Sequence, residues 1–126
     1  MSSRTALLLV AHGSRREASN REVARLTDRL RKQAAGRYQA VACAFLGLAE
    51  PTVPAGIEAC IAAGADCVIV LPCFLSAGRH VSEDIPGLVA ASQAAHPEAR
   101  IRLASHLGSA EDIAGQLLAL ADLALE

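Results

Sequence analysis

Short runs of apolar residues alternate along this chain with longer segments in which apolar residues recur every three or four positions. Two runs, Thr5 to Ala11 and Cys67 to Pro72, are almost continuously apolar. Parallel strands covered by helices on both faces have this composition, so we expect these two to be neighbours inside a sheet. Gln39 to Leu46 is a third expected strand. From Arg100 to Ser105 arginine alternates with apolar residues, which predicts an edge strand with one solvent-exposed face.

Four amphipathic helices are predicted between and after these strands. The first extends from about Asn20 to Ala35 and ends at Gly36, the second is closed by Gly64, and the third stops before Pro97. The apolar stripes of the first and fourth helices are Val23, Leu26, Leu30 and Ala34, and Ile113, Leu117, Leu120 and Ala124. Residues 1–126 therefore predict one α/β domain, an open doubly wound four-stranded parallel sheet with helices on both faces.

The composition of the chain argues against several classes of function. A hydrophobic fraction of 52% over 126 residues is enough for one core, and no apolar run reaches the roughly 20 residues of a membrane-spanning helix. A net charge of -1 and three aromatic residues argue against a nucleic-acid partner. We also see no secretory signal, so we expect a cytoplasmic protein. The four cysteines form no Cys-x-x-Cys pair, which favours buried thiols over zinc ligands or disulfides.

The residues that directly follow the strands carry the candidate chemistry, because ligands of such sheets bind outside the carboxyl ends of the strands. The first strand leads to His12, the second to Glu50, and the third to His80. Two neutral imidazoles and a carboxylate suit cobalt, iron, nickel or zinc and leave coordination positions open. We therefore predict that these three side chains bind a divalent metal ion at one edge of the sheet.

Each of these residues also has a plain structural alternative. Either histidine taken singly is a loop residue that bonds to nearby backbone, and Glu50 before Pro51 is equally suited to cap the second helix. His96 lies at a helix end, where it interacts with the helix dipole. His106 follows the edge strand and is a weaker candidate for the site.

Arg15, Arg16 and Arg79 flank the two site histidines and predict a local positive patch for an acidic ligand. The alternative for any one arginine is a solvated loop with an ion pair to Glu17, Glu83 or Asp84. Neither a Gly-x-x-x-x-Gly-Lys loop nor a Gly-x-Gly-x-x-Gly turn follows a strand. We therefore expect a reaction that uses neither ATP nor a dinucleotide.

At these residues the sequence resembles the short, single-domain class II chelatases, the sirohydrochlorin cobaltochelatase family with its ferrochelatase relatives. The resemblance spans nearly the whole chain. It is carried by Ala11-His12-Gly13-Ser14-Arg15 with Asn20, by Phe45-Leu46 and Leu48-Ala49-Glu50-Pro51-Thr52, and by Pro72, Phe74-Leu75, Gly78, His80 and Asp84-Ile85-Pro86. The fourth block, His106-Leu107-Gly108-Ser109-Ala110, lacks the His or Pro that often follows this glycine in relatives, which puts substrate contacts from that loop in doubt.

The resemblance implies a chelatase-like half unit in which His12 and His80 hold the metal and assist proton removal, with Glu50 as the acidic partner. It also implies a homodimer and a sirohydrochlorin-like substrate, whose carboxylates would suit the arginines. The predicted substrate-binding residues are Ser14, Arg15, Arg16, Phe74 and Arg79. Cobalt is the favoured ion, with iron and nickel as alternatives, and the pathway is that of cobalamin or siroheme.

Two other functions fit parts of the sequence. A histidine phosphotransferase of the phosphoglycerate mutase kind also places His-Gly after its first strand, but there an arginine precedes the histidine, whereas here Ala11 does. A dimer that only binds or carries cobalt or nickel would use the same two histidines, yet it would leave the arginine cluster without a purpose.

Overall fold

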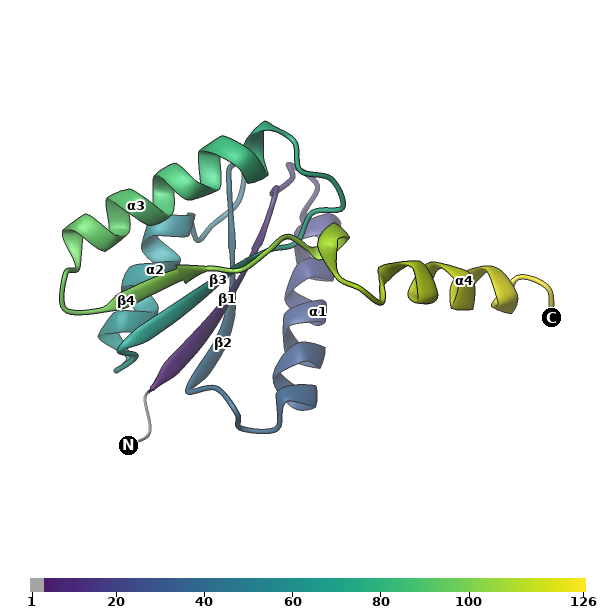
Figure 1. The fold of residues 1–126 in the computed structure, drawn as a ribbon, viewed down its shortest axis with the longest axis horizontal. Coiled ribbons are helices and arrows are strands. Elements are labelled where there is room, and N and C mark those ends of the chain that lie inside the picture. The colour runs from purple at the N-terminus through teal and green to yellow at the C-terminus, as the bar shows by residue number, and fades with distance from the viewer. Residues whose placement is uncertain (1–3) are drawn as a thin grey trace.

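The four predicted strands form one parallel sheet in the computed structural model, which describes residues 4–126 (Figure 1). The strands are β1 (Thr5–Ala11), β2 (Ala40–Phe45), β3 (Cys67–Pro72) and β4 (Arg100–Leu103), in the order β2-β1-β3-β4. As predicted, β1 and β3 are neighbours in the interior and β4 lies at the edge. β4 stops two residues earlier than expected, after the Ala104 N–H donates the last bond to the carbonyl of Val70.

The helices are α1 (Glu17–Ala34), α2 (Val53–Ala62), α3 (Ile85–Ala95) and α4 (Ile113–Leu123). A π-helical turn, η1 (His80–Asp84), leads into α3, and a 3-10 turn, η2 (Leu107–Ser109), precedes α4. α1 begins three residues before the predicted Asn20, because its first turn is polar and gives no apolar signal. The αβ alternation and the doubly wound topology are confirmed.

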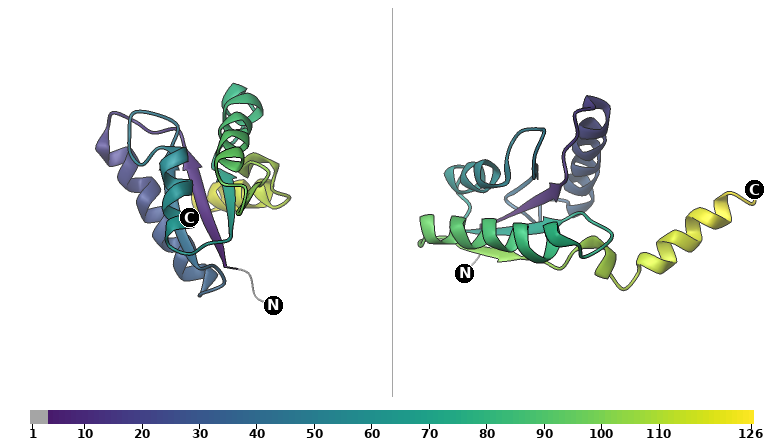
Figure 2. Two further views of the ribbon diagram at one scale, coloured as in Figure 1. Left: turned by 90° about the vertical axis from the view of Figure 1, so that its left-hand side faces the viewer. Right: turned by 90° about the horizontal axis from the view of Figure 1, so that it is seen from above.

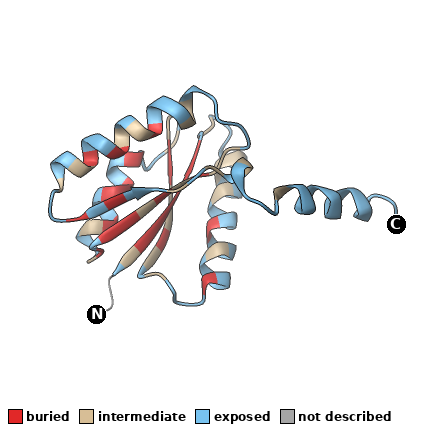
Figure 3. Cartoon of the chain, in the orientation of Figure 1, coloured by how far each residue is buried: buried red, intermediate tan, exposed pale blue. Residues whose placement is uncertain are grey.

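The core lies mainly between the sheet and the pair α2 and α3. Leu8 and Val70 on the strands are fully buried in one cluster with Ile57 of α2 and Ile85 of α3. Figure 3 shows buried residues in red along the strands and on α2 and α3. The alternate strand residues, such as Leu7, face the side covered by α1. The two layers fix the strands rigidly, so the loops at their carboxyl ends start from defined positions.

Thr52, and not Glu50, caps α2. The Thr52 hydroxyl accepts the backbone N–H of Ala55 at 3.3 Å, in the geometry of an N-cap side chain. Glu50 lies one position too early, before a cis peptide bond to Pro51. The capping alternative for Glu50 is therefore wrong.

α4 forms where it was predicted, but it does not pack on the sheet. It projects from the carboxyl-end side of the molecule, as both views of Figure 2 show. Leu117, Leu118, Leu120 and Leu123 are 57%, 66%, 64% and 63% exposed. The prediction that helices cover the sheet on both faces is thus met by α1 on one side and by α2 and α3 on the other, without α4.

None of the helices within residues 4–126 is long and apolar enough to cross a membrane. The first three residues, which belong to the segment searched for a secretory signal, lie outside the described residues.

Candidate functional site

Two imidazole rings face one another at the carboxyl edge of the sheet. His12 directly follows β1, and His80 opens η1 after the loop that leaves β3. Their ring centroids lie 4.4 Å apart, with an angle of 86° between the ring planes. Metal–nitrogen bonds of about 2.1 Å place two imidazole nitrogens at most about 4.2 Å apart, so rings this close can share one ion. The predicted convergence of these two histidines is therefore seen.

Gly13 holds the His12 loop against the loop that follows β2. Its φ of 89° lies in the left-handed region, and a Cβ at this position would come within 1.8 Å of the Gly47 carbonyl oxygen. The Gly47 N–H in turn donates to the His12 carbonyl at 3.1 Å. Only glycine allows the two loops to approach this closely, and the approach sets the position of His12.

Asp84 orients the ring of His80. The Nδ1 atom of His80 lies 2.7 Å from the Oδ2 atom of Asp84, four residues later. A carboxylate on one ring nitrogen fixes the tautomer and leaves the other nitrogen, Nε2, for a metal. His80 was expected on a loop, but it lies in the π-helical turn that brings the two side chains together. Such turns are frequent at functional sites.

Phe74 forms an apolar wall beside the histidines. Its ring centroid is 5.3 Å from that of His12 and 6.4 Å from that of His80. The neighbouring Cys73 is half-buried, and burial raises the pKa of its thiol. Burial therefore favours the neutral thiol, as expected for a cysteine that packs as a small apolar residue.

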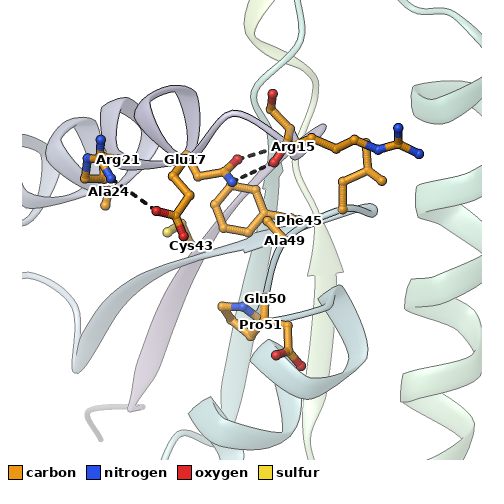
Figure 4. Close-up of a pocket in the computed structure, with 12 residues that line it drawn as sticks. Arg15, Glu17, Arg21, Ala24, Cys43, Phe45, Ala49, Glu50 and Pro51 are labelled. Atoms are coloured by element: carbon orange, nitrogen blue, oxygen red, sulfur yellow. Dashed lines mark hydrogen bonds and ion pairs between the residues drawn. The ribbon is translucent and has the colours of Figure 1, made fainter.

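An open pocket of about 520 Å³ lies between the start of α1 and the loop that follows β2 (Figure 4). Ser14 and Arg15 line it, so it shares the loop that carries His12. Asn20 fixes this loop because its side chain accepts the Ser14 N–H at 3.0 Å and donates to the Ser14 carbonyl at 2.8 Å. The Ser14 hydroxyl accepts the Arg16 N–H. Its predicted substrate contact remains a prediction.

Glu50 lies on the far rim of this pocket. It is exposed, and its carboxylate points away from Arg15 in Figure 4. Within residues 4–126 no three His, Cys, Asp or Glu side chains are arranged to hold a metal ion together. The structure therefore does not bring Glu50 into a three-ligand site with His12 and His80. A role in proton transfer remains a prediction.

The three arginines of the predicted patch differ in their partners. Arg79 pairs with Glu83 at 3.0 Å, with both side chains largely exposed, which is the structural alternative considered for it. Arg15 and Arg16 are exposed and form no ion pair with the described part of the chain, since Glu17 pairs with Arg21. Two unpaired cations thus remain beside the His12 loop.

The other two histidines lie outside the pair. His96 ends α3 and is 3.5 Å from Glu98 and 3.8 Å from Glu58. The carbonyl of His106 accepts two bonds from Ser109, and its ring is not among the described rings that pack against His12. His96 therefore lies near two acidic side chains, and a site role for His106 remains a prediction.

Comparison with known proteins identifies the family. The model of the CbiX family matches residues 6–122. The chain belongs to the CbiX family. This CbiX chain is 32% identical over 108 residues to a sirohydrochlorin ferrochelatase of Bacillus subtilis (strain 168), an alignment that covers 86% of this chain and 41% of the relative.

Two further relatives extend the comparison. A sirohydrochlorin cobaltochelatase of Methanococcus maripaludis is 39% identical over 84 residues, which cover 67% of this chain and 57% of the relative. The crystal structure of a CbiX protein from Marinobacter aquaeolei VT8 superposes with a TM-score of 0.83 at 26% identity, over 96% of this chain and 97% of that one. This CbiX chain spans about half the length of the curated relatives that it matches.

Asp84 and Asn20 carry part of the family resemblance, but the sequence did not predict what their side chains do. The only contact predicted for Asp84 was an ion pair with an arginine, although its spacing of four from His80 indicates contact on one helix face. Asn20 is a residue of the first matching block and the predicted start of a helix, and neither observation predicts the two hydrogen bonds between its side chain and the Ser14 backbone.

We expect Asp84→Asn to weaken the affinity for a divalent metal ion such as cobalt about 10-fold or more, because the amide no longer fixes the His80 tautomer as a carboxylate does. Isothermal titration calorimetry with cobalt measures the affinity. Glu83→Gln is the matched control, since Glu83 contacts Arg79 rather than a histidine. Equal effects of the two substitutions would contradict this role of Asp84.

Proposed function

We propose that this CbiX chain inserts a divalent metal ion into sirohydrochlorin, in the biosynthesis of cobalamin or siroheme. The observation that carries the proposal is the pair of facing imidazoles, His12 and His80, at an open edge of the sheet. The curated relatives named sirohydrochlorin ferrochelatase and cobaltochelatase support the substrate and the reaction class. Cobalt is the favoured ion, with iron and nickel as alternatives.

Insertion requires that the metal exchange its water ligands for ring nitrogens and that two pyrrole N–H groups lose their protons. Two imidazole ligands hold the ion with most of its coordination positions open to the ring. An imidazole that is released from the metal, or the carboxylate of Glu50, accepts a proton. Phe74, beside both histidines, offers an apolar surface on which a macrocycle can lie. Neither step uses ATP or a nucleotide.

The substrate carries several carboxylates, and the free cations at the site suit them. Arg15 lines the open pocket and Arg16 follows it, while both lack an ion pair with the described residues. A bidentate bond from a guanidinium to a carboxylate would orient the macrocycle over the histidines. Ser14 and Arg79 are further contacts in this proposal, Arg79 after release from Glu83.

A homodimer is part of the proposal, because one exposed edge cannot enclose a macrocycle. Relatives about twice as long as this chain support the idea that a second unit covers the site. The four cysteines are free, which is compatible with the reducing cytoplasm that we propose as the location.

Anaerobic addition of the protein to sirohydrochlorin and cobalt tests the reaction. We expect the absorption bands of the free macrocycle to be replaced by those of the metal complex faster than in a protein-free control. A protein that only carries the metal would bind cobalt without accelerating this change, and that result would replace the chelatase with the carrier. Parallel runs with iron and nickel rank the ions.

A further inference from the structure

The charged residues of this chain are unevenly distributed. Residues 15–37, which comprise α1 and the residues beside it, contain eight of the 12 basic residues but only three of the 13 acidic residues. This segment therefore has a net charge of +5, whereas the remainder of the chain has a net charge of -6. The overall charge of -1 thus conceals a marked separation of charge within the molecule.

Four of these basic residues form a cationic row on the outer face of α1. Thr27 and Ala34 are the buried residues of the helix and Leu30 is half-buried, so these positions define the face that packs on the sheet. Spacings of four, four and three residues place four exposed side chains together on the opposite face: Arg21, Arg25, Arg29 and Lys32. At 1.5 Å per residue, the cationic row is roughly 16 Å long.

Most of the cationic row has no anionic partner within the chain. Arg21 pairs with Glu17 at 3.6 Å. Arg25, Arg29 and Lys32 form no ion pair with any other residue in the range 4–126. Like charges at this spacing destabilise a helix by about 0.2–0.5 kcal/mol per pair, so the row does not stabilise α1. Its charge is therefore directed at an anion outside the chain.

The cationic row leads to the candidate site. α1 begins at Glu17, five residues after His12, and Figure 1 shows its first turn on the side of the sheet where the strands end. Arg21, the first member of the row, lines the same open pocket as Arg15 (Figure 4). The amino end of a helix also carries the positive pole of its dipole. The fields of the row, the dipole and Arg15 therefore add up at this pocket.

The composition of α1 favours a long-range attraction over a docking surface for a macromolecule. The helix contains no aromatic residue, and its one exposed large apolar side chain is Leu26, at 40%. Stable protein interfaces need a desolvated apolar centre, and surfaces that bind single-stranded nucleic acid use aromatic rings. Solvated charges instead act over a Debye length of about 8–10 Å and raise encounter rates about 10- to 1,000-fold.

We propose that the cationic row of α1 attracts the polycarboxylate substrate from solution and guides it to the edge where His12 and His80 face one another. The inference rests on the proposed function for the identity of the substrate, and it adds a surface that acts before the substrate is bound. The remainder of the chain, with its net charge of -6, repels the same anion, so encounters are concentrated beside α1. The row sets the association rate, whereas residues that touch the bound macrocycle set the dissociation rate.

The test measures the association of sirohydrochlorin with the full chain by anaerobic stopped-flow absorption, without metal, so that insertion does not contribute. We expect the association rate constant of the wild type to fall about 10-fold or more between about 10 mM and 1 M salt, as the Debye length falls from about 30 to 3 Å. Arg25→Glu/Arg29→Glu should lower this constant about 10-fold at 10 mM salt and change the dissociation rate constant less than about twofold.

Arg100→Glu/Arg102→Glu is the matched control, because it changes the net charge equally at two exposed residues of β4. We expect its association rate constant to stay within about threefold of the wild type. Equal effects of the two double variants, association that does not depend on salt, or a loss of rate that persists at 1 M salt would each overturn the proposal. A wild type that does not bind the macrocycle would refute the proposed function, and this inference with it.

Discussion

Replacement of His12 or His80 with alanine is expected to lower the rate of cobalt insertion into sirohydrochlorin at least about 100-fold. Each ring supplies one of only two nearby imidazoles, whose centroids are 4.4 Å apart, so either substitution leaves the ion with a single protein ligand. The rate is measured anaerobically from the absorption of the macrocycle, and the cobalt affinity by titration calorimetry. Both quantities should fall in both variants.

His96→Ala is the matched control for these variants. His96 lies at the end of α3 near Glu58 and Glu98, and it contacts neither site histidine in the described structure. We expect its rate to equal that of the wild type. Full rates in both His12→Ala and His80→Ala would show that the metal is held elsewhere on the chain.

Gly13→Ala should reduce the free energy of unfolding by about 3 kcal/mol or more, the second large effect that the structure predicts. The added Cβ would lie 1.8 Å from the Gly47 carbonyl oxygen, at a φ of 89° that alanine avoids. The two loops must separate, and the His12 ring moves with its loop. Urea denaturation measures the stability, and cobalt titration measures the consequence for the site.

Gly47→Ala is the control for Gly13→Ala, because it alters the other member of the same contact. A Cβ on Gly47 meets nothing within 4 Å. We expect a change of stability within about 1 kcal/mol and an unaltered cobalt affinity. A Gly13→Ala protein as stable as Gly47→Ala would mean that the loops do not need their close approach.

The strands could be predicted from the sequence because interior strands of a parallel sheet are almost continuously apolar. β1 and β3 begin and end at the predicted residues. Continuous apolar runs are typical of parallel strands that are covered on both faces. The meeting of His12 and His80 followed from the same rule, because parallel strands deliver their following residues to one edge.

Contacts that depend on loop paths could not be predicted. The sequence treated Glu50 as a member of the metal site or as a cap, whereas the described structure does not bring it into a three-ligand site and Thr52 takes the cap. The role of Asp84 depends on a π-helical turn, which has no clear sequence signature. The exposure of α4 was not predicted either, because an apolar stripe indicates a helix face that packs on the rest of the domain.

In the proposed reaction, the two-imidazole arrangement would also set an order of metal affinities along the route of the ion. A pair of monodentate donors binds a divalent cation more weakly than a macrocycle with four inward nitrogens, so release to the ring runs downhill. Because this binding is weak, a cellular chelator with three or more donor atoms would remove the metal ion from the protein. A molecule that delivers the metal must therefore bind it more weakly than His12 and His80 do, or transfer it by direct contact.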